Sequence, residues 1–362
     1  MNKKQEPSSS QPHDVVSKSA GEYETYEHRS TGSQRPNRSL GQLSRSARLG
    51  FAVKVLGKEG LRSHDSRRWQ NAPHLRVSLG YLGEVFSYLS EADIRMYRMA
   101  SGLAPYVTHP DHPEFHGQVA ECVEELERIG GLAKRMGVRL SFHPGQYIVI
   151  NSTDEGVAMR SIADLEVQAR ILETMGLGDE AVVVTHIGGA YGDRQAALTR
   201  FASRTEMLSP VAQRRLVVEN DDRIFGVEDA LLVHKMTGLR VVFDAHHHQS
   251  YNPGGIPTSE AAQLSIGTWS GWDVPAKVHF SSPRAEGGRG DGDKQQNFRA
   301  HARFIDPDSF IEFYRPLAHL APDVMLEAKA KDKALMQLRR ELGMRAPDLA
   351  DCFQPERKQL KA

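Results

Sequence analysis

Cysteine is scarce in this chain, and neither sign of charge is in excess. Cys122 and Cys352 are the only cysteines among 362 residues, so we expect no disulfide framework and a reducing compartment. Lys plus Arg and Asp plus Glu both number 46, which argues against the strongly basic composition of many nucleic-acid-binding proteins. The sequence has no run of about 18 apolar residues and no apolar N-terminal signal segment, so we expect no membrane partner and a cytoplasmic location.

Composition divides the chain into one long core-forming region and two polar ends. Residues 1–48 are rich in Ser, Gln, Arg, Pro and Gly and poor in aliphatic residues, so we expect a disordered N-terminal arm. A solvated arm is the simpler interpretation, and an arm that lies along DNA through its arginines is the alternative. We place one large domain at residues 49–345 and a polar C-terminal tail at residues 346–362.

Short apolar runs alternate with amphipathic stretches from residue 49 onward. This alternation predicts a (β/α)₈ TIM barrel, because an open doubly wound sheet, the alternative, gives no reason to stop at eight strands. The expected strands cover residues 49–53, 94–99, 139–142, 181–185, 216–218, 240–243, 276–278 and 323–326. The expected helices cover residues 75–89, 115–136, 154–175, 193–208, 227–236, 258–266, 307–320 and 331–342.

Each of the six expected strands from the third to the eighth is followed by a His, Asp or Glu. In TIM barrels the active site is built at the carboxyl ends of the strands, so these side chains should converge. They offer imidazoles and carboxylates but no thiolate, and more ligands than one ion can use, which predicts a cluster of divalent ions such as Mn²⁺ or Zn²⁺. The residues are His143, His186, Glu219, Asp244 with His246–His248 behind it, His279 and Glu327.

Several neighbouring residues have two interpretations. The run His246–His248 either turns one histidine inward or forms a solvated loop, and Asn220 either orients a carboxylate or bonds only to the backbone. The stretch from Arg284 to Arg303 is locally basic and either holds phosphates or is a solvated loop face. Trp269 and Trp272 either cap the barrel or contact DNA.

Six segments that contain these residues resemble the motif series of the ultraviolet damage endonucleases. The resemblance runs from about residue 49 to residue 331, and the order and spacing of several motifs make it specific. It implies a barrel that binds damaged double-stranded DNA across its top, bends it and flips the damaged dinucleotide out. It also implies a cut immediately 5′ to cyclobutane dimers and 6-4 photoproducts. The segments are His143–Tyr147, His186–Gly192, Glu219–Asp222, Asp244–His248, Lys277–His279 and Val324–Lys329.

The resemblance implies roles for individual residues. Glu219 matches a catalytic carboxylate that bridges two ions, Lys277 a carboxylated lysine beside the cluster, and His109 a further active-site histidine. Gln146 and Tyr147 match the pair that the family inserts into the duplex to fill the space left by the flipped bases. The implied metal ligands are His143, His186, Glu219, Asp244, His247, His279, His301 and Glu327.

Three more positions bear on the recognition of the lesion. Arg98 lies in the segment Arg95–Pro105, which is similar to the family's second-strand segment, and we expect it to contact DNA. Phe51 stands where the family usually has a probing Tyr, and Val55 where it usually has an Asn. We expect Phe51 to face the lesion, but the missing hydroxyl and amide leave the lesion preference open.

The residues and the resemblance together predict a hydrolase, namely a metal-dependent endodeoxyribonuclease of DNA repair that acts on photoproducts and also on abasic sites. A cluster of two or three ions would activate water to attack the phosphodiester and stabilise the leaving oxygen. We expect Mn²⁺, with Zn²⁺ or Mg²⁺ as alternatives, and a monomer without a nucleotide cofactor. The alternatives are an apurinic-site endonuclease without photoproduct activity and a metal-dependent sugar isomerase or epimerase. A sugar enzyme needs a closed pocket and no duplex probe, so Gln146 and Tyr147 distinguish the classes.

Overall fold

The computed structural model describes residues 46–284 and 298–354. The expected N-terminal arm lies outside the described residues except for its last three positions. The middle of the basic stretch between Arg284 and Arg303 also lies outside them, so its contact with phosphates stays a prediction. No helix in the described part of the chain is long and apolar enough to cross a membrane.

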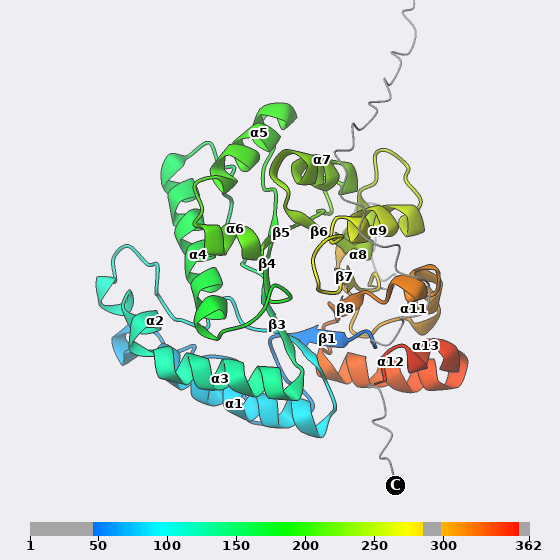
Figure 1. The fold of residues 1–362 in the computed structure, drawn as a ribbon, viewed down its shortest axis with the longest axis horizontal. Coiled ribbons are helices and arrows are strands. Elements are labelled where there is room, and N and C mark those ends of the chain that lie inside the picture. Colours follow the sequence, from blue (N-terminus) through cyan, green and yellow to red (C-terminus); the bar gives the residue numbers. More distant parts are fainter. Residues whose placement is uncertain (1–45, 285–297, 355–362) are drawn as a thin grey trace, which may run out of the picture. The chain divides into compact units, whose positions relative to one another are not determined.

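Eight parallel strands close into a barrel in which each strand pairs with its neighbours in sequence and the last pairs with the first (Figure 1). The strands are β1 (Leu49–Ala52), β2 (Met96–Arg98), β3 (Arg139–Phe142), β4 (Val182–His186), β5 (Leu216–Glu219), β6 (Arg240–Asp244), β7 (Lys277–Phe280) and β8 (Asp323–Leu326). The expected TIM barrel is therefore confirmed. The register places His186 beside Glu219 and Asp244 beside His279, so the carboxyl ends of β4 to β7 bring these side chains together.

Helices surround the strands (Figure 1), and local sequence signals mark several of their ends. The Asp154 carboxylate accepts the N–H of Val157 where α4 begins, and Gly137, with a φ of 64°, ends α3. The α-helices are α1 (Leu75–Glu91), α2 (Gln118–Glu121), α3 (Val123–Met136), α4 (Glu155–Thr174), α5 (Arg194–Thr205), α6 (Pro210–Arg215), α7 (Val227–Thr237), α8 (Ala245–Ser250), α9 (Thr258–Gly267), α11 (Pro307–Tyr314), α12 (Asp332–Arg345) and α13 (Pro347–Asp351). The 3₁₀ helices are η1 (Trp69–Asn71), η2 (Pro113–Phe115) and η3 (Arg315–Leu320).

Alternate residues of the strands enter different parts of the core. Val183 of β4 belongs to the large cluster formed with the helices, whereas Val182 and Val184 belong to a second cluster with Val217 and Val242. Because successive side chains of a strand point to opposite faces, the second cluster fills the barrel interior. The functional side chains at the strand ends therefore lie directly above a closely packed apolar interior.

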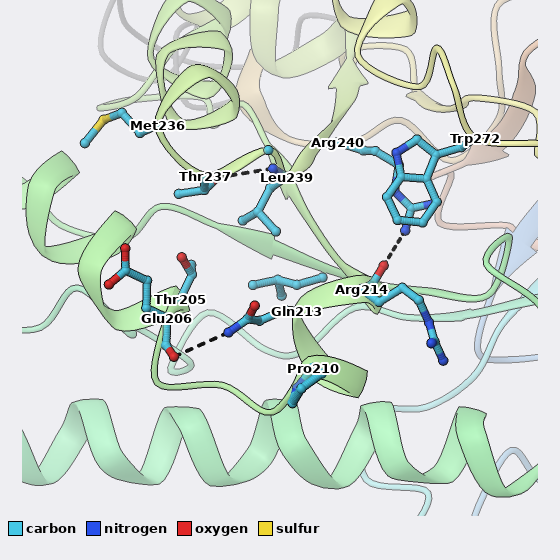
Figure 2. A pocket seen from close by; sticks show the side chains of 12 residues that line it. Thr205, Glu206, Pro210, Gln213, Arg214, Met236, Thr237, Leu239, Arg240 and Trp272 are labelled. Carbon is cyan, nitrogen blue, oxygen red and sulfur yellow. Dashed lines mark hydrogen bonds between the residues drawn. The ribbon is translucent and has the colours of Figure 1, made fainter.

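Two tryptophans cover the end of the barrel at which the strands begin. Trp269 is buried and donates its Nε1–H to the Val241 carbonyl at 2.7 Å. The Arg240 guanidinium at the start of β6 lies 4.7 Å from the ring centre of Trp269 and 3.9 Å from that of Trp272. Figure 2 shows Arg240 stacked on Trp272 beside a groove of about 410 Å³. Of the two interpretations, the structure supports the cap, at the end opposite the histidine-bearing strand ends.

Gly130 lies where α3 packs against the residues that follow α4. A Cβ atom on Gly130 would lie 1.8 Å from the Met175 carbonyl oxygen, whereas one on Gly131 would meet only the Arg135 side chain, at 3.3 Å. We expect Gly130→Ala to lower the free energy of unfolding by roughly 1–3 kcal/mol through overpacking. Gly131→Ala, its matched control, should be neutral or slightly stabilising. Urea unfolding of both variants measures this, and equal midpoints would contradict the packing described.

Both boundaries of the barrel differ from those expected. Ala47, in the expected arm, donates its N–H to the Cys352 carbonyl at 2.8 Å. In the expected tail, α13 buries Leu349, and the Phe353 ring lies 4.7 Å from that of Tyr314. Residues 46–48 and 346–353 therefore pack on the barrel. The composition of these segments is polar overall, and the few apolar side chains within them make the contacts.

Candidate metal centre

Imidazoles surround Glu219, the last residue of β5. Its buried carboxylate forms hydrogen bonds with His143 Nε2 and His279 Nδ1, both at 2.8 Å. His186 Nε2 and His247 Nδ1 lie 3.7 and 3.5 Å from its oxygens. Burial opposes the ionisation of this carboxyl, but the charges of the neighbouring histidines outweigh burial and hold its pKa well below the usual range. Glu219 is therefore an anion at the centre of four imidazoles.

Asp244, the last residue of β6, enters the cluster beside Glu219. One oxygen accepts the backbone N–H of His247 at 2.8 Å, which caps α8 and sets the His247 ring beside Glu219. The other oxygen lies 3.9 Å from His279 Nδ1. The side-chain amide of Asn220 bonds to the backbone N–H and carbonyl of Asp244, at 2.9 and 3.0 Å. Asn220 therefore joins β5 to β6 through the backbone of Asp244, and among the described residues its side chain makes no hydrogen bond to a carboxylate.

The run His246–His248 forms the helix α8, so the interpretation as a solvated loop is wrong. His246 and His248 are buried, and their Nε2 atoms bond to the carbonyls of Arg299 and Ile256, at 3.0 and 2.8 Å. The ring of His247 is the one that lies against Glu219. A single turn of helix thus gives three neighbouring histidines different surroundings.

Glu327 follows β8 and closes the cluster on its other side. Its oxygens lie 3.4 Å from His279 Nδ1 and 3.8 Å from His301 Nε2, and the Arg98 guanidinium forms a short ion pair with it. Burial opposes ionisation here too, but Arg98 and His279 outweigh it and hold the pKa of Glu327 well below the usual range. His301 is held by a 2.7 Å hydrogen bond between its Nδ1 and Ser281 Oγ.

The donor atoms of this cluster fit divalent ions. Among the described residues, Asp244 Oδ2 and His279 Nε2 are buried and have no hydrogen-bond partner, which is costly unless a ligand or water compensates. Carboxylate oxygens and imidazole nitrogens without thiolates suit hard or borderline ions. Three groups, each with ligand atoms within 4.8 Å of one another, could hold a metal: His143–His279–Glu327, His143–His186–Glu219 and Glu219–Asp244–His247.

Lys277 lies on β7 inside the barrel. It is fully buried, and its Nζ donates a hydrogen bond to Ser141 Oγ at 2.9 Å. Burial, and then the positive charges of Arg98 and Arg139, hold the pKa of its ammonium group well below the usual range. The surroundings therefore favour the neutral amine, which is the nucleophilic form of a lysine.

Two residues expected at the site lie away from the cluster. Phe51 is fully buried, with its ring 5.4 Å from that of Tyr97 in the core between strands and helices, so the expectation that it faces DNA is wrong for this structure. His109 lies in the segment after β2, where its ring is 5.9 Å from that of Tyr106 and 4.8 Å from that of His112. Among the described contacts, no hydrogen bond or ion pair joins His109 to the cluster.

The loop after β3 carries Gln146 and Tyr147 to the surface beside the cluster. Tyr147 is 82% exposed, the largest exposed fraction among the large hydrophobic side chains of the described residues. A pocket of about 620 Å³ is lined by Gln146 together with His186, His247 and His301. Gln146 and three histidines of the cluster thus line one open pocket, and Tyr147 is the neighbour of Gln146 outside that lining.

Tyr191, after β4, lines the same pocket and was not singled out by the sequence. It is 46% exposed, has a φ of 52°, and lies with its ring 5.6 Å from the Arg200 guanidinium. An aromatic residue held with a positive φ is uncommon. The glycines Gly188, Gly189 and Gly192 around it were the available signal, because they mark a tight loop.

The chain forms a closed (β/α)₈ barrel, and His, Asp and Glu side chains converge at the carboxyl ends of its strands. This combination is typical of TIM-barrel enzymes that bind metal ions. The model of the family UV-endonuclease UvdE matches residues 77–349, and the chain belongs to this family. It is 32% identical over 275 residues to a UV DNA damage endonuclease of Bacillus cereus (strain B4264), covering 74% of this chain and 82% of the relative. The corresponding protein of Bacillus mycoides (strain KBAB4) is 32% identical over 265 residues, covering 72% and 78%.

Solved structures agree with this assignment. The crystal structure of SacUVDE matches with a TM-score of 0.72 and 26% identity, covering 82% of this chain and 98% of that one. A D-tagatose 3-epimerase-like protein matches with a TM-score of 0.51 and 14% identity, covering 84% and 98%. At that identity the second likeness shows the fold alone.

Proposed function

We propose that the chain is a metal-dependent DNA repair endonuclease that nicks duplex DNA immediately 5′ to ultraviolet photoproducts and also acts at abasic sites. The chain belongs to a family of endonucleases for ultraviolet damage, and cleavage of damaged DNA is an activity of that family. The position of the cut and the range of lesions are our proposal for this chain. The observation that supports the finer proposal is the pocket that Gln146 lines together with His186, His247 and His301 of the ligand cluster, next to the exposed Tyr147. Recognition and cleavage would then occur within one pocket.

The ligands of two or three divalent ions would come from the cluster around Glu219. Bound ions would supply Lewis-acid chemistry, activating water for attack at phosphorus and stabilising the departing 3′ oxygen. Mn²⁺ is our first choice, and Zn²⁺ or Mg²⁺ also suit oxygen and nitrogen donors. The proposed ligands are His143, His186, Glu219, Asp244, His247, His279, His301 and Glu327.

Lys277, Arg98 and His109 would support the reaction in different ways. A neutral Lys277 amine can add to carbon dioxide, forming an N–C bond and releasing one proton, and the carboxylated side chain would be a further anion below the ions. Arg98 already neutralises Glu327 and would contact DNA from the same edge. His109, which lies beside the rings of Tyr106 and His112, would reach the site only when DNA is bound.

Gln146 and Tyr147 would sense the lesion. A tyrosine that is 82% exposed can stack in the gap left by flipped bases, and Gln146 can hydrogen-bond the orphaned partners. Photoproducts and abasic sites already stack badly and bend easily, so selectivity would come from deformability. A sugar epimerase does not need an exposed loop of this kind. An apurinic-site endonuclease would cut abasic DNA but not photoproducts, so an assay with both substrates distinguishes it from our proposal.

Removal of divalent ions should abolish nicking of irradiated duplex and lower the melting temperature, because the five imidazoles and three carboxylates proposed as ligands then lose the ions that they bind. Adding Mn²⁺ back should restore both. Nicking of plasmid DNA that was irradiated, depurinated or left untreated, with and without chelator, measures this. Undiminished nicking in chelator would contradict the metal-dependent mechanism, and nicking of depurinated DNA alone would favour the apurinic-site alternative.

A further inference from the structure

Two strained residues lie at the mouth of the barrel, in the segments that follow the adjacent strands β1 and β8. Val53, directly after β1, has a φ of 66°, and Lys331, at the start of α12, has a φ of 52° and a ψ of −124°. Residues with a Cβ atom avoid these conformations because of steric strain, and β-branched residues avoid them most. Lys54 directly follows the strained Val53, so each strained turn presents a lysine.

Hydrogen bonds hold the first of these turns in place. The N–H of Val53 donates to the Arg98 carbonyl at 2.9 Å, and the Tyr97 hydroxyl donates to the Val53 carbonyl at 2.5 Å. Both partners belong to β2, the neighbouring strand. The turn that presents Lys54 is therefore fixed to the same strand that carries Arg98.

A buried carboxylate joins the two lysine-bearing turns. Asp332, next to Lys331, accepts the N–H groups of Leu56 and Gly57 at 2.7 Å each, and the hydroxyl of Tyr88 at 2.6 Å. It is fully buried. This anchor fixes the segment after Lys54 to the start of α12, so the two lysines keep a constant relation to each other.

Positive charges outnumber negative ones around the turns that carry Lys54 and Lys331. Lys54 is exposed and Lys331 is half-buried, and within the described part of the chain neither ammonium group makes an ion pair or a hydrogen bond. Arg98 and Lys54 both lower the pKa of Lys331, after the larger effect of burial, whereas Glu327 raises it. The three cations thus share one neighbourhood, with Glu327 as their acidic neighbour. If Glu327 binds metal, the three positive charges need another anion.

We propose that Lys54 and Lys331, together with Arg98, form a binding site for a phosphate of the DNA backbone. The site lies over β8, β1 and β2, whereas the pocket beside Gln146 is lined by residues at or after the ends of β3 to β7. DNA held at both places would cross the ligand cluster. The proposal rests on the proposed function in that the ligand is duplex DNA, but it does not require that the DNA be damaged.

Binding of undamaged duplex tests the proposal separately from repair activity. We expect Lys54→Gln and Lys331→Gln each to weaken binding about 5- to 10-fold near 0.1 M salt, and to reduce the slope of log K against log salt by about one. Lys331→Arg should keep the wild-type slope. Lys333→Gln is the matched control, because Lys333 is exposed on α12 only two residues away. Fluorescence anisotropy of a labelled duplex at several salt concentrations, with Mn²⁺ present, supplies these values.

The outcomes distinguish failure of the phosphate site from failure of the proposed lesion specificity. If both glutamine variants melt like the wild type and keep its affinity and salt slope, the phosphate site is refuted. A slope lowered as much by Lys333→Gln would show diffuse charge and would refute it as well. If the slopes fall as expected while irradiated duplex is never nicked, the phosphate site stands and the proposed lesion specificity fails.

Discussion

Glu219→Gln should reduce single-turnover nicking of irradiated duplex by roughly 10³-fold or more. The substitution removes the anion that contacts His143 and His279 at 2.8 Å and belongs to two of the three ligand groups. Loss of a ligand that positions metal ions costs several kcal/mol of transition-state stabilisation, and about 1.4 kcal/mol is a factor of ten in rate. Metal content, measured by mass spectrometry on the same sample, should fall with the rate.

Glu206→Gln is the control, because Glu206 lines the groove at the opposite end of the barrel (Figure 2). It should keep the wild-type rate and metal content. If Glu219→Gln binds the full complement of metal and nicks at the wild-type rate, the central role of Glu219 is refuted. A variant that does not fold would be recognised by its circular dichroism, and Glu219→Asp, which keeps the charge, then provides the comparison.

Tyr147→Ala should slow the nicking of a photoproduct by about 10- to 100-fold and leave metal content and melting temperature unchanged. Stacking of a base on an aromatic side chain contributes roughly 1–3 kcal/mol, and a side chain that is 82% exposed contributes little to folding. Abasic DNA should lose less, because fewer stacked bases must be separated there. Rates on matched duplexes with a dimer or an abasic site measure the difference.

Tyr147→Phe is the matched control, since it keeps the ring and loses only the hydroxyl. It should retain most of the wild-type rate on both duplexes. If Tyr147→Ala cuts every substrate as fast as the wild type, Tyr147 has no part in sensing damage, while the account of the metal centre is unaffected. An equal loss on undamaged, abasic and irradiated DNA would instead indicate a general DNA contact.

The barrel could be predicted because its strands are short apolar runs separated by amphipathic helices. Helices that lack this signal were missed. In α8 three successive histidines replace the apolar periodicity, and α13 has Leu349 as its one buried residue. Their helical form depends on contacts made by the whole fold, such as the cap that Asp244 places on α8.

The convergence of the cluster was predictable for a geometric reason. Once the strands are known, their carboxyl ends must meet at one end of the barrel, and His143, His186 and Glu219 follow directly. Phe51 was misplaced because side chains of a strand alternate between faces. Leu49 and Phe51 of β1 pack in the main core, while Ala52 belongs to the cluster with Met96 and Met325.

The most direct test of the account uses a duplex with one cyclobutane dimer at a known position, full-length protein and Mn²⁺. We predict a single cut at the phosphodiester immediately 5′ to the dimer, visible as one product band on a sequencing gel. The cut should be absent with Glu219→Gln and from the same duplex without the dimer. An intact dimer-containing duplex, or equal cutting of damaged and undamaged strands, would contradict the account.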